Sequence, residues 1–384
     1  MKLFPTLVLR LSIHQLPRKP IQNSLKIRGF TTSPKIKMQS VKNTIAENMG
    51  KIVSGAHSLA PEDSQFSLEQ VPDLSGKVAV VTGGSEGIGY GCTHTLLTHN
   101  ISKLFVLSVT EKELIDDAIN AIKEELGEEM ANRVHWIHCE LSDWEATSKT
   151  AFDIASKTDR IDILINNAAR GIMTAQLAKN GVDLHMAANH MGHVVLTSHL
   201  LPLLKKTSEK GDTVRIVNLG SNAHEGSPKD TKFDSVEELN KDNGPQQQYG
   251  RSKLAAILYS KYLNKHLTSQ YPNILVNATH PGVVETRQSA ELIHEAYPLG
   301  GYAMSVGLAP FKKTQFEGAV STMFASTATT KSGQYICPPA IVERGSDLAN
   351  DEELGERLME LTRKTIKERT ASASVEKGCP MKDF

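Results

Sequence analysis

Short apolar runs recur along the chain, and the segments between them are long enough to form helices. The run at residues 78–82 is rich in β-branched residues, which is typical of a strand buried on both faces of a parallel sheet. Similar runs predict further strands at residues 104–107, 133–138, 161–165, 213–219, 274–279 and 334–336. Helices are expected from the first strand's turn to about residue 99, and at residues 111–126, 180–206, 249–266 and 351–368.

This alternation of strands and helices predicts an α/β fold. We expect a Rossmann-type, doubly wound parallel sheet with right-handed crossovers, covered by helices on both faces to give three layers, α/β/α. A single dinucleotide-binding domain should span residues 76–345. An arm at residues 41–75 would precede it, and a C-terminal helix and tail at residues 346–384 would follow.

The first 40 residues differ in composition from the rest of the chain. No Asp or Glu precedes Glu47, whereas nine lysines and arginines do. A basic, hydroxyl-bearing and acid-poor segment is typical of a mitochondrial transit peptide, and residues 28–33 resemble a presequence cleavage region. A disordered basic tail, or a working start at Met38, would give the same pattern. Of these interpretations we favour import, and we expect a mitochondrial protein.

Composition and charge count against several other classes of protein. The 384 residues carry a formal net charge of +0, so nothing indicates a nucleic-acid surface. The apolar run at residues 3–11 is shorter than the ~20 residues that span a bilayer, and no later run reaches that length. The four cysteines show no Cys-x-x-Cys spacing, and no Cys or acid flanks the histidines of residues 185–199 to complete a site. We therefore expect no metal and no disulfide framework.

A glycine-rich turn follows the first predicted strand and opens the first predicted helix. Its sequence is Thr82-Gly-Gly-Ser-Glu-Gly-Ile-Gly89. Glycines let backbone N–H groups approach a pyrophosphate, and the N-terminus of a helix favours negative charge. Such a turn can also serve tight packing alone. Its place between a strand and a helix predicts a dinucleotide site.

A second candidate for chemistry is Tyr249-Gly-Arg-Ser-Lys253. A Tyr and a Lys four residues apart lie on one face of a helix. A phenol normally keeps its proton to about pH 10, and a fixed ammonium beside it lowers that pKa. Tyr249 could then exchange a proton with a carbonyl or alcohol oxygen near neutral pH. Alone, such a pair is common and usually forms a solvated helix face, so its weight depends on the motifs upstream.

Taken together, these motifs resemble the short-chain dehydrogenase/reductase family. In order they are Thr82-Gly-x-x-x-Gly-Ile-Gly89, Asn166-Asn-Ala168, Ser221, Tyr249-x-x-x-Lys253 and Pro281-Gly282. The resemblance covers about residues 75–340. Two features are similar to the retinol-dehydrogenase-like and WW-domain-oxidoreductase-like branch, namely His280-Pro-Gly282 and the long gap between Ser221 and Tyr249.

The resemblance implies four catalytic residues. Tyr249 would be the general acid/base, and Lys253 would lower its pKa and hold the nicotinamide ribose hydroxyls. Ser221 would hydrogen-bond the substrate oxygen and stabilise developing charge. Asn189 would hold a water that links Lys253 to solvent. Taken singly, Ser221 could be a strand-end turn residue and Asn189 a helix cap, but the four residues in register favour catalysis.

The resemblance also implies the contacts of a nicotinamide cofactor. Around the pyrophosphate they would be Gly83, Ser85, Gly87, Ile88 and Gly89. On the adenosine side they would be Thr110, Glu140, Leu141, Asn167 and Ala168, with Glu140 in the place of the usual Asp. On the nicotinamide side they would be Pro281, Gly282, Val284 and Thr286, together with Tyr249 and Lys253.

The end of the second strand bears on the choice of cofactor. An acid there would bind the ribose 2′-OH of NAD(H), whereas an Arg just after it would suit the 2′-phosphate of NADP(H). Val109 stands near the expected acid, and Thr110 near the expected Arg. The hydroxyls of Ser108 and Thr110 could bind a phosphate, although Glu86 lies where NADP-using relatives often carry a base. We therefore favour NADP(H) over NAD(H).

The expected function is hydride transfer between this cofactor and an apolar carbonyl or alcohol, in the EC 1.1.1 class. Residues 288–312 are apolar and could form a helical flap over such a substrate, although core packing or a subunit contact would suit the same pattern. The resemblance suggests a homodimer or homotetramer through the long helices at residues 181–206 and 249–266. The alternative is a catalytically silent nucleotide-binding structural protein, since fold alone does not fix function.

Overall fold

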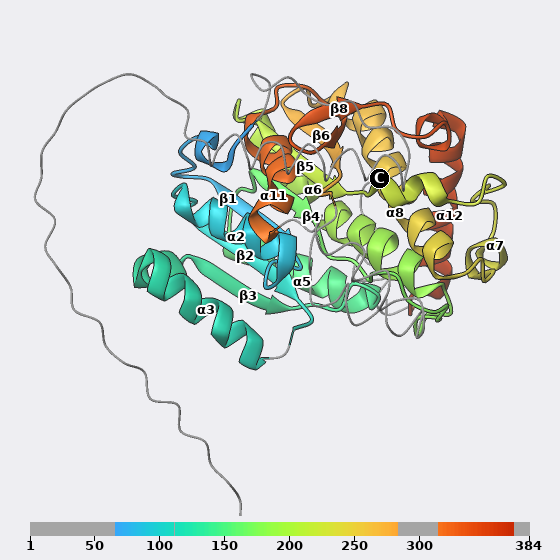
Figure 1. Cartoon of the computed structure of the whole chain (residues 1–384), viewed down its shortest axis with the longest axis horizontal. Helices are drawn as coiled ribbons and strands as arrows, with labels where there is room; N and C mark the ends of the chain where they lie inside the picture. Colours follow the sequence, from blue (N-terminus) through green and yellow to red (C-terminus); the bar gives the residue numbers. More distant parts are fainter. Residues whose placement is uncertain (1–65, 111, 283–313, 372–384) are drawn as a thin grey trace, which may run out of the picture. The chain divides into compact units, whose positions relative to one another are not determined.

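The architecture is taken from a computed structural model that describes residues 66–110, 112–282 and 314–371 (Figure 1). Its strands form one sheet in the order β3-β2-β1-β4-β5-β6-β7-β8. Of the strand pairs described, those from β3 to β7 are parallel, and β8 is antiparallel to β7. The strands are β1 (Val78–Thr82), β2 (Lys103–Ser108), β3 (Val134–His138), β4 (Ile163–Asn166), β5 (Val214–Leu219), β6 (Ile274–Thr279), β7 (Tyr335–Cys337) and β8 (Ile341–Glu343).

Helices cover both faces of this sheet, because successive residues of a strand point to opposite faces. Ala79 and Val81 of β1 pack with α2 (Gly87–Thr98), α3 (Lys112–Leu126) and α11 (Gln315–Met323). Val78 and Val80 pack with the second helical layer. That layer comprises α5 (Trp144–Lys157), α6 (His193–Glu209) and α8 (Pro245–Leu263). The predicted three-layer α/β/α fold with a doubly wound sheet is therefore confirmed.

The predicted strands are all present, with boundaries that agree or differ by one or two residues. The sequence interpretation missed β8, a short strand of half-buried and exposed residues at the edge of the sheet. Such a strand lacks the continuous apolar run by which the buried strands were found. The helix expected at residues 180–206 is split into a π-helical segment, η3 (Met186–Gly192), and α6.

A C-terminal helix, α12 (Glu352–Arg369), lies alongside α8 (Figure 1). Leu354, Leu358 and Leu361 of α12 share a buried cluster with Leu254 and Leu258 of α8. Since α8 also contacts η3, η4 (Asn222–Gly226), β5 and β6, its residues 250–260 are buried without interruption. The part of α8 that was predicted to contact another subunit is therefore mostly covered within the chain itself.

The remaining short elements connect these layers. They are the 3-10 turns η2 (Leu68–Gln70), η4 (Asn222–Gly226) and η8 (Leu348–Asn350), the π-helical segments η5 (Asn264–Thr268) and η7 (Phe324–Ala328), and the helices α4 (Glu128–Asn132) and α7 (Val236–Asn240). The predicted transit peptide, the flap at residues 288–312, Val284 and Thr286 lie outside the described residues. None of the helices in the described ranges is long and apolar enough to cross a membrane.

Candidate active site

A cavity of about 530 Å³ opens at the carboxyl ends of the central strands. The chain runs outward in opposite directions from β1 and β4, and in open α/β sheets this switch point is where ligands bind. The lining includes these residues predicted from the sequence: Gly83, Ser85, Gly87, Ile88, Thr110, Glu140, Leu141, Asn167, Ala168, Asn189, Ser221, Tyr249, Lys253, Pro281 and Gly282. Gly89 lies behind the lining, in the turn that shapes it.

The glycine-rich turn is held in a conformation that side chains would disrupt. Gly83 has a φ of +64°, in the left-handed region that favours glycine. A Cβ on Gly89 would lie 2.0 Å from the carbonyl oxygen of Gly83, far inside contact distance. The amide of Asn167 donates to the carbonyl oxygens of Thr82 (2.8 Å) and Gly83 (3.2 Å). Asn167 thus pins the turn that could cradle a pyrophosphate.

Three hydroxyls meet where β2 ends against this turn. The Ser85 Oγ lies 2.8 Å from both the Ser108 Oγ and the Thr110 Oγ1, and the last two oxygens lie 2.5 Å apart. The Glu86 carboxylate accepts from the Thr110 hydroxyl at 3.5 Å. The three hydroxyl hydrogens are engaged within the cluster and with Glu86, so a ligand oxygen would have to replace one of these bonds, and Glu86 adds a negative charge at the edge of the cluster.

An ion pair that the sequence interpretation missed lies on the adenosine side of the cavity. The guanidinium of Arg170 is 2.7 Å from Oε2 of Glu140, and both side chains are about one-third exposed. The other carboxylate oxygen of Glu140 accepts from the backbone N–H and the hydroxyl of Ser142. Glu140, expected to face adenine, is therefore already engaged on both oxygens. Arg170 could have been found from the sequence, because it directly follows the motif Asn166-Asn-Ala-Ala169.

Asn189 clamps the backbone of Arg170. Its Oδ1 accepts from the Arg170 N–H at 2.6 Å, and its Nδ2 donates to the Arg170 carbonyl at 3.0 Å. The same Nδ2 donates to the Ser252 hydroxyl, which donates to the carbonyl of Tyr249 at 2.8 Å. Both side-chain amide hydrogens of Asn189 are thus used within the protein. The water expected from the family resemblance could therefore bind Asn189 only by donating to one of the oxygens of this residue. Ser252 is a further residue that the sequence interpretation did not single out.

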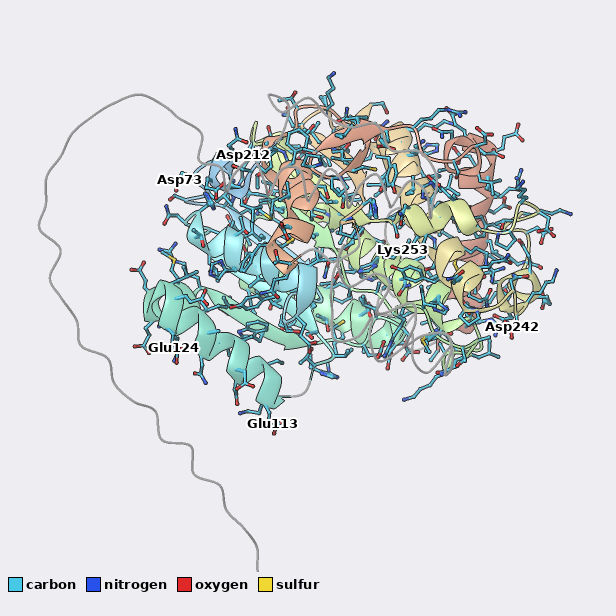
Figure 2. The ribbon with its side chains drawn as sticks, in the orientation of Figure 1. Asp73, Glu113, Glu124, Asp212, Asp242 and Lys253 are labelled. Carbon is cyan, nitrogen blue, oxygen red and sulfur yellow. The ribbon has the colours of Figure 1, made fainter. Side chains whose placement is uncertain are left out.

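Tyr249, Ser221 and Lys253 lie together at one end of the cavity. The Tyr249 phenol is hydrogen-bonded to Ser221, and the Lys253 Nζ is 5.5 Å from the centre of the phenol ring. Lys253 lies in the interior of the molecule, unlike Glu113 and Glu124 at its edge (Figure 2), and its Nζ donates to the Leu219 carbonyl at 2.8 Å. The predicted grouping of these side chains is therefore present.

The electrostatics of this group differ from the sequence expectation. Burial raises the pKa of Tyr249 to about 12, and the hydrogen bond with Ser221 only partly opposes the rise. Burial also lowers the pKa of Lys253 to about 8. The expectation that Lys253 brings the Tyr249 pKa below its ordinary value is thus not met here, because loss of water outweighs the hydrogen bond with Ser221.

A buried histidine links the glycine turn to Asn189. The Thr82 hydroxyl oxygen accepts the backbone N–H groups of Asn167 and Ala168, so its hydrogen donates to Nε2 of His193, 2.8 Å away. The opposite ring nitrogen, Nδ1, then carries the proton and donates to the Asn189 carbonyl at 2.9 Å. Burial lowers the pKa of His193 to about 4, so the ring is neutral at physiological pH.

Within residues 66–110, 112–282 and 314–371, no group of three or more His, Cys, Asp or Glu side chains could hold a metal ion. The histidines of η3 and α6 instead bond to protein groups. His190 Nε2, for example, lies 2.9 Å from the hydroxyl of Thr362 in α12.

Comparison with known proteins identifies related chains. The family model described as "short chain dehydrogenase" matches residues 77–231. The Neurospora crassa protein named "Putative oxidoreductase bli-4, mitochondrial" is 56% identical over 351 residues, covering 90% of this chain and 84% of that protein. A polyprenol dehydrogenase of Danio rerio is 30% identical over 275 residues, covering 71% of this chain and 80% of that protein. An uncharacterized protein from Mycobacterium paratuberculosis has the same fold, with a TM-score of 0.60 at 22% identity over 79% of this chain and 98% of its own.

Proposed function

The chain belongs to the short-chain dehydrogenase/reductase family, and on that premise we propose that it transfers a hydride between a nicotinamide cofactor and an apolar carbonyl or alcohol. The observation that carries the proposal is the grouping of Tyr249, Ser221 and Lys253 at one end of a cavity whose other end is a glycine-rich turn. The cofactor would supply the hydride, and the protein would supply position and electrostatics.

Tyr249 serves as the general acid/base in this proposal. Because its pKa lies at about 12, the phenol carries its proton at neutral pH and can protonate a carbonyl oxygen; the same group would take the proton from an alcohol in the reverse direction. The Ser221 hydroxyl, bonded to the phenol, orients the same substrate oxygen. The Lys253 cation stabilises negative charge on that oxygen or on the phenol.

The cavity suits a dinucleotide. The turn at residues 83–89 and the N-terminus of α2 would hold the pyrophosphate, and Lys253 would meet the nicotinamide ribose. We favour NADP(H) over NAD(H) because the hydroxyls of Ser85, Ser108 and Thr110 lie together and could turn from one another toward a 2′-phosphate. Glu86 opposes this choice. Titration calorimetry with each cofactor tests it, and tighter NAD(H) would overturn it.

An apolar substrate is supported by the relatives and by part of the lining. One relative is named a polyprenol dehydrogenase, whose substrate is a long apolar alcohol. The lining of the cavity includes the apolar residues Ile172, Ala188 and Leu219. A mitochondrial location is supported by the basic N-terminal composition and by the name of the Neurospora relative. A homodimer or homotetramer is supported by the family resemblance alone.

The experiment that tests the function is a hydride-transfer assay with aldehydes, ketones and retinoids. Wild type should reduce at least one apolar carbonyl, and Tyr249→Phe should lose about 10²–10⁴-fold in rate, since the phenyl ring cannot donate a proton. Unchanged cofactor affinity in the variant would show that the site is intact. Equal, background turnover by both proteins would favour the alternative, a nucleotide-binding structural protein.

A further inference from the structure

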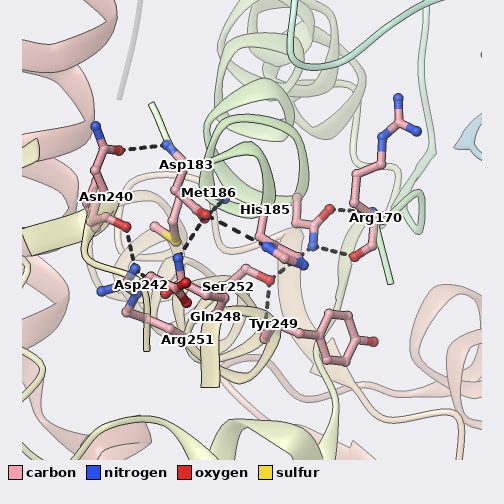
Figure 3. Close-up of polar contacts among 12 residues, drawn as sticks. Arg170, Asp183, His185, Met186, Asn240, Asp242, Gln248, Tyr249, Arg251 and Ser252 are labelled. Atoms are coloured by element: carbon pink, nitrogen blue, oxygen red, sulfur yellow. Dashed lines mark hydrogen bonds and ion pairs between the residues drawn. The ribbon is translucent and has the colours of Figure 1, made fainter. Parts of the chain in front are cut away.

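A buried polar bridge lies directly before Tyr249 in the sequence. It consists of Asp183, which precedes η3, Gln248 in the first turn of α8, and Arg251, one turn further along α8 (Figure 3). The exposed fraction of each residue is 1%. Gln248 Nε2 donates to Asp183 Oδ2 at 3.0 Å, and Arg251 donates to Gln248 Oε1 at 2.8 Å.

The chemistry of the bridge requires a side-chain amide at its centre. A buried carboxylate or guanidinium without partners is strongly destabilising, because neither water nor an opposite charge compensates it. The Gln248 amide satisfies both at once, since its N–H faces the anion and its oxygen faces the cation. A Glu at this position would have no hydrogen for Asp183, and an apolar side chain would satisfy neither charge.

The bridge ties the start of α8 to two other segments. The Arg251 guanidinium also donates to the carbonyl oxygens of Glu238 (2.8 Å) and Leu239, in the last turn of α7. Asn240 accepts the backbone N–H of Asp183 at 2.7 Å. The first turn of α8 is therefore fixed from both sides, by α7 and by the segment that leads into η3.

The same bridge lies behind the ring of Tyr249. His185 donates from Nε2 to the Gly171 carbonyl at 2.8 Å, and its ring meets the Tyr249 ring edge-on, with 6.3 Å between centres. The other nitrogen, Nδ1, lies 3.8 Å from Asp183 Oδ2. Asp183 is thus connected to Tyr249 in two ways: it bonds to Gln248, the residue before Tyr249, and it lies close to His185, whose ring contacts the Tyr249 ring (Figure 3).

We propose that Gln248 is a positioning residue for the reaction: its amide, held between Asp183 and Arg251, fixes the first turn of α8 and so aims the Tyr249 phenol at Ser221. The proposal rests on the catalytic role proposed above for Tyr249. Gln248 itself does not line the cavity, so its effect is exerted through the neighbouring backbone.

Exchanging the amide and the carboxylate provides the test. Gln248→Glu places two carboxylates together. Asp183 Oδ1 also accepts the backbone N–H of Met186 at 3.0 Å, so Asp183→Asn leaves one acceptor oxygen for two donors, Met186 and Gln248. Each single variant therefore breaks the bridge or the contact beside it. The double variant restores it, because the amide of residue 183 can donate to the carboxylate of residue 248, which then pairs with Arg251. Gln247→Glu is the matched control, since it makes the same substitution at the exposed neighbouring position.

The measurements are kcat for carbonyl reduction, the dissociation constant of NADPH and the thermal unfolding midpoint. Because a misplacement of about 1 Å can cost about 10² in rate, we expect kcat to fall about 10–100-fold in each single variant. It should recover to within about threefold of wild type in the double variant, and stay unchanged in Gln247→Glu. NADPH binding should change less than about twofold throughout, since the glycine turn is untouched.

Two results would overturn the inference. One is wild-type kcat in both single variants while Tyr249→Phe is inactive, which would leave the function standing and remove the positioning role. The other is a double variant as slow as the singles with intact NADPH binding. Should Gln248→Glu fail to fold, Asp183→Asn carries the same comparison with the double variant. A fully active Tyr249→Phe would instead overturn the catalytic proposal, and the positioning role with it.

Discussion

Gly250 is the position where a single methyl group should most clearly separate catalysis from cofactor binding. It lies between Tyr249 and Arg251, where α8 passes against η4. A Cβ at Gly250 would meet the carbonyl oxygen of Ala223 at 2.4 Å. Ordinary contact begins at 3.4 Å, so the two backbones must separate by about 1 Å.

This separation changes the geometry of the catalytic group. The Ala223 N–H donates to the Ser221 Oγ at 3.1 Å, so a shift of Ala223 moves Ser221 away from the Tyr249 phenol. We expect Gly250→Ala to lower kcat about 100-fold, the cost of a misplacement of about 1 Å. The higher helix propensity of Ala, about 1 kcal/mol, partly offsets a steric cost of about 1–3 kcal/mol, so stability should fall by at most about 2 kcal/mol.

The assay is steady-state carbonyl reduction together with NADPH titration and urea unfolding. Gly226→Ala is the matched control, because Gly226 ends the same η4 segment and a Cβ there meets nothing within 4 Å. The control should keep wild-type kcat and stability. A Gly250→Ala protein that folds, binds NADPH and turns over at the wild-type rate would refute the argument.

Three further outcomes follow from buried groups. Burial lowers the pKa of His190 to about 3 and that of His193 to about 4; below pH 6.5 the unfolded chain therefore binds protons that the native state excludes. Urea unfolding should show the free energy of unfolding falling as the pH is lowered to 4. Each of the two histidines should contribute about 1.4 kcal/mol per pH unit, and a flat profile would contradict this. Because the pKa of Lys253 is about 8, its charge is present below that pH, and kcat/KM for reduction should fall as pH rises through 8; a constant value from pH 6 to 10 would count against a catalytic cation. Because α12 covers α8, any dimer should form across another face. Cross-linking followed by mass spectrometry should find no link between two copies through residues 250–260, and such a link would disprove this.

Regular patterns made the fold predictable. Buried parallel strands are continuous apolar runs, so β1 and β6 were predicted with their observed boundaries. The edge strand β8 was not, because it carries no such run. The π-helical segment η3 was also missed, because its residues show the same apolar pattern as the α-helix that follows. The side chains of Asn189 and His190 within it bond to groups far away in the sequence, Arg170 and Thr362, which the pattern does not reveal.

That most of the candidate residues line one cavity was predictable from the sequence, whereas their contacts were less so. The order and spacing of the motifs predicted that Ser221, Tyr249 and Lys253 would lie together, and all three line the cavity. It did not show that Arg170 engages Glu140, because that pair joins two loops 30 residues apart in sequence. Nor did it give the sign of the Tyr249 pKa shift, which depends on how much water the fold removes.

The central claim is that the Tyr249 phenol protonates a substrate oxygen while hydride reaches the adjacent carbon. Its most direct test follows deuterium from NADPH labelled at C4 of the nicotinamide into an apolar aldehyde, by mass spectrometry under single-turnover conditions. We expect wild type to deliver deuterium to the product carbon, and Tyr249→Phe, with NADPH bound, to do so about 10²–10⁴-fold more slowly. Equal rates of transfer in the two proteins, or no transfer in wild type, would contradict the account.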